Sequence, residues 1–416
     1  MEPPVIQTLR GMMYTVLHIL FFIIFIYLSV NIGYLLILSI AGLFSTKRPL
    51  QPNDAKKRIA VLITTYKEDD VIINTVKSAA DHNYPRDKFD VFVAAHKLKP
   101  STIDALKKLT AEITEVKFEM GSKARSLNYL LNNIDPARYD IAVILDADNV
   151  MMPGFLEKIN TAFQKGYRSV QGHRTAKNRN TSIAILDAIS EEVNNHLFRR
   201  APRVLGFSSS LIGSGMAFEF PTLVRIYNKP GILDNPACDR EVDFELMKEG
   251  IMIEYLDDAI VLDEKVSRQE IFEKQRRRWL ESQFSHIKLF FSKKEQVAHK
   301  TKDYWNKLFV NLLPPRIFFI GIFSLIFVIC ILQYFTHSNI TGIQIRWWIL
   351  LFIGFLIAMM AAIPSRFMKL STLAAFLYIP SLFLSYLRAA FTMKSDRKEF
   401  VHTPKTFTGK SGTTEK

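Results

Sequence analysis

Four long segments without a charged side chain constrain most strongly what this chain of 416 residues can fold into. Asp, Glu, Lys and Arg are absent between Arg10 and Lys47, between Arg316 and Arg346, between Arg346 and Arg366, and between Lys369 and Arg388. A helix needs about 20 apolar residues to cross a bilayer, and each segment approaches or exceeds that length. One such run fits a buried helix of a soluble protein, but four together predict a membrane protein.

The first segment predicts an N-terminal transmembrane anchor within residues 1–48. Its apolar stretch, 14–44, is long enough for one tilted helix, although Asn31 and Gly33 interrupt it. A cleaved signal peptide is less favoured, because its apolar region would span only about 7–15 residues. The other segments predict two to three transmembrane helices within residues 313–393, since Pro380 interrupts the last run.

Basic residues after the first segment (Lys47, Arg48 and 56–58) indicate that the central region faces the cytoplasm, at the plasma or inner membrane. Residues 285–312 combine apolar and basic side chains, which predicts an amphipathic interfacial segment. The tail, 394–416, is basic and is expected to be flexible. Three C-terminal spans would place this tail opposite the central region, so either the charge rule fails or one segment lies flat or re-enters.

The overall composition narrows the class of protein further. The apolar fraction of 49% excludes a disordered chain, and 2 cysteines exclude a disulfide scaffold. With 54 Lys+Arg against 40 Asp+Glu, the net charge of +14 indicates nucleic acid, a membrane surface or a phosphorylated ligand as partner. Nucleic acid is the least favoured of these, because the basic residues cluster beside the apolar segments.

Residues 49–284 have a different texture, that of a cytosolic α/β domain. Short β-branched runs predict strands at 58–65, 89–95 and 141–145, and helices are expected at 69–83, 102–109 and 123–133. Strands that alternate with helices predict a parallel sheet covered on both faces. Ligands of such sheets bind beyond the carboxyl ends of the strands.

Polar residues of three segments point to chemistry at that edge. Asp146 and Asp148 directly follow a strand and could share a divalent cation with a diphosphate, or form an ordinary solvated turn. The adjacent arginines 276–278 need anionic partners or water, so a diphosphate or lipid headgroups would suit them. Asp239 begins a predicted helix, where it either complements the helix dipole or acts as a general base.

Two further pairs have plain structural interpretations. His173 and Arg174 either border the site or end a surface strand. Glu191 and Glu192 fit an ordinary polar face of a helix over residues 182–200.

Taken in order along residues 55–285, these motifs resemble those of membrane-embedded, processive-type family-2 glycosyltransferases, such as hyaluronan, chitin, cellulose and poly-N-acetylglucosamine synthases. The resemblance is carried by the segments Tyr66-Lys67-Glu68, Lys123 to Asn128, Asp146-Ala147-Asp148, Gly213-Ser214-Gly215, Asp239 and Gln275 to Trp279. It implies a GT-A (Rossmann-like) domain flanked by transmembrane helices.

The resemblance also implies a role for each residue. Donor and nucleotide contacts would come from Tyr66, Glu68, Lys123, Asp146 and Arg278, and Asp148 would hold Mg²⁺ or Mn²⁺. Acceptor contacts would come from Gly213, Ser214, Gly215, Gln275 and Trp279. Asp239 would be the catalytic base.

Three departures from the family pattern concern the donor and the base. Ala95 stands where the family usually has an aspartate that contacts the nucleobase, and His96 could replace it. Ala237 and Cys238 precede Asp239 in place of Thr-Glu, and Lys67 replaces an asparagine. These changes point to altered donor choice or, less favoured, to loss of activity.

We therefore expect an inverting hexosyltransferase that moves a sugar from a nucleotide-sugar, UDP-linked by preference, onto a growing polysaccharide or glycan at the membrane, with a β-linkage. The alternatives are transfer of one sugar to a lipid-linked acceptor, and a degenerate membrane scaffold. Membrane lipids are expected partners, and a secretion partner or a second copy of the chain stays open.

Overall fold

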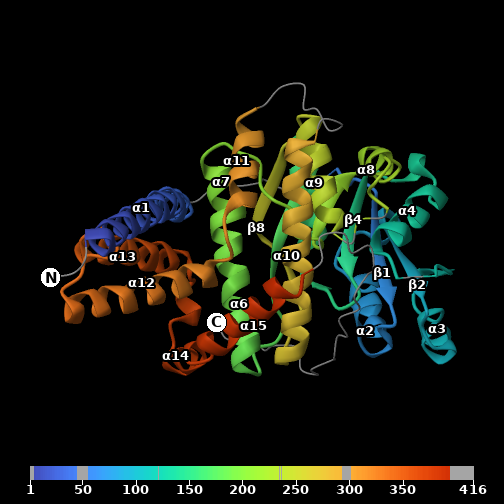
Figure 1. Ribbon diagram of the computed structural model, residues 1–416. Coiled ribbons are helices and arrows are strands. Elements are labelled where there is room, and N and C mark those ends of the chain that lie inside the picture. The colour runs from blue at the N-terminus through green and yellow to red at the C-terminus, as the bar shows by residue number, and fades with distance from the viewer. Residues whose placement is uncertain are drawn as a thin grey trace.

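The computed structural model describes residues 4–44, 55–119, 121–233, 235, 237–292 and 301–393 (Figure 1). An α/β part built on one twisted sheet occupies one end of the molecule, and helices α1, α12 and α13 extend from the other end (Figure 1). The helices are α1 (Pro4–Ala41), α2 (Asp69–Ala80), α3 (Pro100–Leu106), α4 (Lys123–Asn133), α5 (Phe155–Gln164), α6 (Ser182–Asn195), α7 (Ala201–Val204), α8 (Phe220–Tyr227), α9 (Cys238–Lys248), α10 (Gln269–Phe291), α11 (Lys302–Leu312), α12 (Arg316–Thr336), α13 (Ile345–Ala362), α14 (Leu370–Phe376) and α15 (Ile379–Phe391).

The described strands form one sheet in the order β3-β2-β1-β4-β7-β6-β8-β5. Their bounds are β1 (Ile59–Tyr66), β2 (Phe89–His96), β3 (Glu112–Val116), β4 (Ile141–Asp146), β5 (Val150–Met151), β6 (Ser169–Ala176), β7 (Met216–Glu219) and β8 (Ile253–Asp263). The predicted strands and helices of the first half of this domain are confirmed within a few residues.

The expectation of an all-parallel sheet is wrong at β7. This strand runs antiparallel to both β4 and β6, whereas β1, β2, β3 and β4 are parallel. Because β7 runs against β4, the loop that precedes β7 lies at the edge where β4 ends. The reversal therefore brings 213–215 beside Asp146, and Gly215 N donates to Ile144 O over 2.9 Å.

Apolar cores cover both faces of the sheet, as the sequence predicts. On one face, residues of α2 and α5 such as Ile72 and Phe155 pack against Val61 and Val143. On the other face, α4, α8 and α9 cover the alternate side chains of the same strands. This burial makes the sheet a rigid support for the loops at its carboxyl edge.

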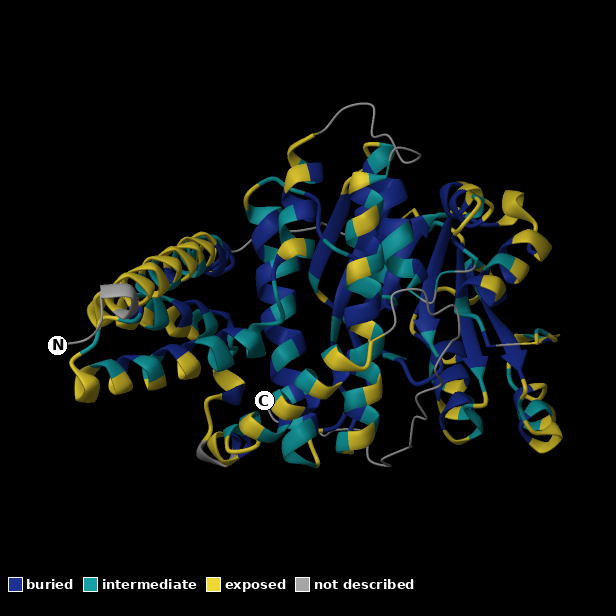
Figure 2. Cartoon of the chain, viewed as in Figure 1, coloured by how far each residue is buried: buried dark blue, intermediate teal, exposed yellow. Residues whose placement is uncertain are grey.

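Four helical stretches of the described residues are long and apolar enough to cross a membrane: Gln7–Ala41, Arg316–Thr336, Ile345–Ala362 and Thr372–Phe391. Exposed apolar side chains cover the outside of α1, α12 and α13 (Figure 2), which is the distribution expected for helices that face lipid. The fourth stretch is broken into α14 and α15, and α15 packs along α10, where Gln269 Nε2 donates to Ser381 and Ser385 over 2.9 Å. Helix α15 also contacts α12, where the rings of Phe318 and Phe383 lie 6.3 Å apart, and whether this fourth segment crosses the membrane, lies flat or re-enters stays a prediction.

Helix α6 and the π-helix that follows it (His196–Arg200) attach the apolar helices α1, α12 and α13 to the sheet domain. The ring of His196 lies 2.8 Å from Ser39 O of α1. Arg316, the first residue of α12, binds Asn194, and Arg366, which follows α13, binds Glu192. Both ends of the α12–α13 hairpin are thus fixed on one helix of the α/β domain.

The predicted interfacial segment 285–312 falls partly outside the described residues. Its first part is the last turns of α10, where His286 and Phe290 are buried and pack against Phe244 of α9. Its last part is α11, where Trp305 and Leu312 are exposed. The tail 394–416 lies outside the described residues.

Candidate active site

A cavity of about 1120 Å³ opens at the carboxyl edge of the sheet and continues toward the apolar helices α12 and α13. Ten of the twelve predicted site residues line it, namely Tyr66, Glu68, Lys123, Asp146, Asp148, Gly213, Asp239, Gln275, Arg278 and Trp279. The other two, Ser214 and Gly215, belong to the same loop but face the protein interior: Ser214 is fully buried, and a Cβ added to Gly215 would press on Val261. Of the predicted acceptor loop, only Gly213 faces the cavity.

Lys123 joins two parts of the site. This first residue of α4 forms an ion pair with Asp146 at the end of β4, and its Nζ donates to Gly213 O. Burial alone would lower the pKa of Lys123, but the Asp146 carboxylate outweighs burial and raises this pKa. The ammonium group therefore stays charged at the mouth of the site, where it suits a ligand phosphate.

The turn that carries Asp148 is fixed by the end of β8. Asn149 accepts from Asp146 N over 3.0 Å and donates to Asp263 over 3.1 Å. Asp148 is almost completely buried, lines the cavity, and accepts from Glu264 N over 3.0 Å. The orientation of its carboxylate is thus set before any ligand arrives.

The carboxylates of Asp146 and Asp148 are the candidate ligands of a divalent cation. The described part of the chain holds no cluster of three or more His, Cys, Asp or Glu side chains that could hold a metal on its own. Mg²⁺ usually binds through one or two carboxylates together with substrate phosphates. Asp146 and Asp148 therefore fit a cation that is completed by ligand phosphate oxygens rather than enclosed by protein.

Asp239 lies opposite, in the first turn of α9. A Cβ added at Gly213 would be 3.4 Å from its Oδ2, so the carboxylate lies directly against this loop. Its neighbour Cys238 is buried, which raises the pKa of the thiol to about 11, and Tyr227 donates to its sulfur over 3.7 Å. The thiol therefore stays protonated, and Asp239 is the group of this turn that can accept a proton from a ligand.

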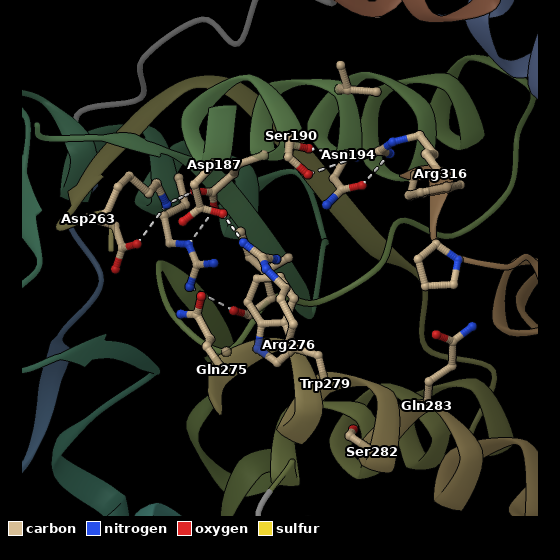
Figure 3. A pocket seen from close by; sticks show the side chains of 18 of the residues that line it. Asp187, Ser190, Asn194, Asp263, Gln275, Arg276, Trp279, Ser282, Gln283 and Arg316 are labelled. Carbon is tan, nitrogen blue, oxygen red and sulfur yellow. Dashed lines mark hydrogen bonds and ion pairs between the residues drawn. The ribbon is translucent and has the colours of Figure 1, made fainter. Parts of the chain in front are cut away.

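The arginine cluster divides into two different environments. Arg276 is buried, forms an ion pair with Asp187 of α6 and stacks on Trp279, with its guanidinium carbon 3.9 Å from the ring centre (Figure 3). Arg278 lines the cavity; burial lowers its pKa, and Asp146 and Asp239 both act to raise it. The expectation that a diphosphate accounts for the whole cluster is therefore wrong for Arg276, whose counter-charge is a carboxylate of the protein.

Tyr66 and Glu68 line the cavity at the end of β1. The ring of His96 lies 4.9 Å from that of Tyr66 and its Nε2 lies 3.0 Å from Phe118 O. His96 is buried and is absent from the residues described as lining the cavity, so it supports Tyr66 from behind. A direct contact of His96 with a nucleobase is not what this geometry favours.

Glu191 and Glu192 do not form a solvent-facing side of α6, and that interpretation is wrong. Glu191 is buried and paired with both Arg174 and Lys265, and Glu192 is buried and paired with His173 and Arg366. Their partners come from β6, from the segment after β8 and from beyond α13. Helical spacing alone could not reveal these ion pairs, because they depend on packing of α6 between the sheet and the membrane helices.

Two more arginines, the buried Arg199 and the half-buried Arg240, line the cavity without having been recognised in the sequence. Arg199 donates to Asn195 Oδ1 over 3.1 Å, and burial lowers its pKa to about 9. Arg240 donates to Asn311 Oδ1 over 2.9 Å, and burial lowers its pKa as well. Together with Lys123 and Arg278 they make the cavity suited to anionic ligands.

A mixed sheet with paired carboxylates after β4, an aspartate facing them and cationic side chains around a cavity defines a glycosyltransferase of the GT-A fold. Residues 56–282, more than half of the chain, match the protein family described as "Glycosyltransferase like family 2". The chain belongs to this family. No curated protein sequence matches it.

One of the similar solved structures supports the fold. A mannosyltransferase from Pyrobaculum calidifontis, solved with GDP-Man and Mn²⁺, superposes with a TM-score of 0.53 at 17% identity, over 88% of this chain and 97% of that one. TarS from S. aureus gives a TM-score of 0.42 at 13% identity, over 80% and 55% of the two chains. Glucosyl-3-phosphoglycerate synthase from Mycobacterium tuberculosis gives 0.36 at 14% identity, over 55% and 80%.

Proposed function

We propose that this glycosyltransferase moves a sugar from a nucleotide-sugar, UDP-linked by preference, onto an acceptor hydroxyl at the membrane with inversion at the anomeric carbon. The observation that carries the proposal is the position of Asp239 across one cavity from Lys123, Asp146 and Arg278. This arrangement pairs one free carboxylate for proton transfer with cationic groups for a diphosphate. An α-linked donor would give a β-linked product.

Asp239 accepts the proton of the acceptor hydroxyl while that oxygen attacks the anomeric carbon. The bond between this carbon and the diphosphate oxygen breaks as the new glycosidic bond forms. Gly213 leaves room for the acceptor beside Asp239, because a Cβ there would lie 3.4 Å from the carboxylate. Gln275 and Trp279 line the same cavity and orient the acceptor sugar.

Lys123 and Arg278 stabilise the negative charge of the departing diphosphate, which is the kind of fixed electrostatic contact that lowers barriers most. Asp148 and Asp146 would hold Mg²⁺ or Mn²⁺, which neutralises diphosphate charge when bound. Tyr66 and Glu68, at the end of β1, contact the nucleoside. With Ala95 in place of an acidic residue, the nucleobase of the donor has fewer charged contacts. This change would therefore alter which nucleotide-sugar the enzyme uses.

The remaining expectations about the acceptor and the surroundings belong to the same proposal. A growing polysaccharide and a processive mode follow from the family resemblance, as do a cytoplasmic catalytic domain at the plasma or inner membrane and contacts with membrane lipids. Transfer of a single sugar to a lipid-linked acceptor is favoured by a specific observation, the apolar extension of the cavity.

The test is a donor screen on the purified full chain, reading release of UDP or GDP with Mg²⁺ and with Mn²⁺. Asp239→Asn should lower the transfer rate about 10²–10⁴-fold, the usual contribution of a general base, with little change in thermal unfolding. Glu241→Gln is the matched control: this acid stands in the same first turn of α9 but is not among the described residues that line the cavity. Equal rates for wild type and Asp239→Asn would refute the assignment, and absence of metal-dependent binding of any nucleotide would favour a scaffold.

A further inference from the structure

The cavity extends beyond Lys123, Asp146 and Arg278, the proposed donor-binding residues, and beyond Asp239, the proposed catalytic base. It continues between α6 and α10, on which Ser190, Asn194 and Gln283 point toward its interior (Figure 3). Beyond Arg316 its walls come from α12, α13 and α14 and are apolar, with Ile317, Ile320, Leu356, Met359, Leu373 and Phe376. One continuous volume thus has a charged end at the sheet and a hydrocarbon-like end among helices that face lipid.

Arg316 stands where the two ends meet. Its guanidinium donates to Asn194 Oδ1 over 2.6 Å and to the Ser190 carbonyl and hydroxyl over 3.1 Å (Figure 3). All these acceptors are neutral. Among the residues that the structure describes, no carboxylate forms an ion pair with Arg316, whereas Arg276, which also binds α6, has Asp187. A guanidinium withdrawn from bulk water without a counter-charge is costly, and an anionic ligand group would remove that cost.

We propose that this cavity takes an acceptor in which a sugar is joined through a phosphate or diphosphate to a long hydrocarbon chain. The hydrocarbon lies among α12, α13 and α14, the phosphate lies at Arg316, and the sugar lies between α6 and α10 with a hydroxyl at Asp239. This inference rests on the proposed function and names the acceptor class of the same site.

The reaction balances without a further reagent. The acceptor oxygen forms a bond to the anomeric carbon of the donor, the bond from that carbon to the nucleoside diphosphate breaks, and the hydroxyl proton goes to Asp239. The lipid phosphate is not consumed; it only fixes the acceptor in the cavity.

A free glycan chain would fit this extension less well. Polysaccharide hydroxyls need hydrogen-bond partners when they leave water, and the walls beyond Arg316 offer chiefly aliphatic and aromatic side chains. A hydrocarbon chain gains free energy from the same walls, at about 0.8 kcal/mol for each buried CH₂ group.

The experiment uses the purified full chain in phosphatidylcholine vesicles, the donor that the screen identifies, and one sugar offered in three forms. These are the sugar on a polyprenyl diphosphate, the same sugar as an octyl glycoside, and the sugar as a free oligosaccharide. Transfer is read as labelled product in the organic or aqueous phase, and donor hydrolysis by water is read as released nucleoside diphosphate. The lipid diphosphate should be the best acceptor and the oligosaccharide the poorest.

Arg316→Gln should lower the ratio of transfer to hydrolysis about tenfold to one hundredfold for the lipid diphosphate, the effect of losing a charge-assisted hydrogen bond. The octyl glycoside, which lacks the phosphate, should be affected much less, and Arg316→Lys should recover part of the loss. Equal losses for the two lipid acceptors, or faster transfer to the free oligosaccharide, would overturn the proposal.

A second pair of variants keeps the test informative if Arg316→Gln folds poorly. Ile320→Trp fills the apolar end of the cavity and should reduce transfer to both lipid acceptors. Ile331→Trp, on the exposed side of the same helix, should leave transfer unchanged. Equal effects of the two would overturn the proposal, whereas a chain that neither transfers nor hydrolyses any donor, with either metal, would refute the proposed function itself.

Discussion

The molecule contains two groups of charged side chains, one partly exposed at the sheet edge and one buried around α6, that differ in how their charges are paired. The sheet-edge group, Lys123, Asp146, Asp239 and Arg278, lines a cavity in which Lys123 forms an ion pair with Asp146, while Asp239 forms none with the described residues. In the α6 group, Asp187, Glu191 and Glu192 with their cationic partners, each carboxylate forms an ion pair within the protein, although Asp187 and Glu191 line the same cavity. The first arrangement is suited to a ligand, and the second joins the sheet domain to the apolar helices.

This difference separates effects on rate from effects on stability. A variant in the α6 group leaves a buried charge without its partner, which costs folding free energy. If the proposed site is right, a variant in the sheet-edge group would remove a contact to a ligand, which costs binding and transition-state stabilisation. The variants below test whether changes in the α6 group lower stability and changes in the sheet-edge group lower the reaction rate.

The largest effect is expected for Arg276→Gln. Asp187, buried in α6, would lose the partner of its ion pair, and Trp279 would lose the guanidinium that lies 3.9 Å from its ring centre. Removing one member of a buried pair costs about 3–5 kcal/mol, so the unfolding temperature in detergent should fall strongly. The double variant Asp187→Asn/Arg276→Gln should lose less than Arg276→Gln alone, and an undiminished loss would show that the pair itself is not responsible.

Arg278→Gln, two residues along the same helix, should behave in the opposite way. It removes a cation that faces Asp146 and Asp239 in the cavity. We expect kcat/KM for the nucleotide-sugar to fall about 10²–10³-fold, as for the loss of one preorganised electrostatic contact, with an unchanged or slightly higher unfolding temperature. A fall in stability as large as that of Arg276→Gln would contradict the distinction between the two groups.

A smaller effect is expected at Gly213. Its φ of +88° lies in the left-handed region, where an alanine costs about 1–2 kcal/mol, and the added Cβ would lie 3.4 Å from Asp239 Oδ2. Gly166 provides the control, because it has a φ of +89° and nothing within 4 Å of an added Cβ. Both alanine variants should lower the unfolding temperature similarly, but only Gly213→Ala should also lower the transfer rate. Equal rates for the two would mean that Asp239 does not work against this loop.

The sequence predicts features that depend on local pattern and misses those that depend on packing between distant segments. Strands such as β1 and β4 are visible because buried β-branched runs have few alternatives, and the site residues of the sheet edge follow from motifs that lie next to those strands. The direction of β7 was hidden, because four residues carry no signal for parallel or antiparallel pairing.

The α6 group was hidden for a related reason. Glu191 and Glu192 have partners that lie 17 to 174 positions away along the chain, so no local pattern marks them as buried. Arg276 and Arg278 are the same residue type, two positions apart on α10. Only the direction in which the helix points each side chain decides that Arg276 pairs with Asp187 and that Arg278 faces Asp146 and Asp239. Helix packing, which local sequence does not encode, decides between the two roles.

The smallest effect is expected in the pH dependence of stability, which the α6 group should dominate through His173. Burial alone would lower the pKa of His173, but the nearby carboxylates of Asp257 and Glu192 raise it above the ordinary value near 6.5. A raised pKa means that the folded state binds the proton more tightly. The contribution is therefore fully present below about pH 6.5 and is lost as the pH rises through the pKa of the folded state.

The effect should be modest, because the neutral ring can still donate one hydrogen bond to a carboxylate. Unfolding measured from pH 6 to pH 9 should show stability declining in wild type, and His173→Gln should flatten this decline. The Asp239→Asn variant serves as the control from the sheet-edge group and should keep the wild-type slope. If His173→Gln kept the slope and Asp239→Asn removed it, the charges that join the two parts of the molecule would be those of the cavity, and the division drawn between the two groups would fail.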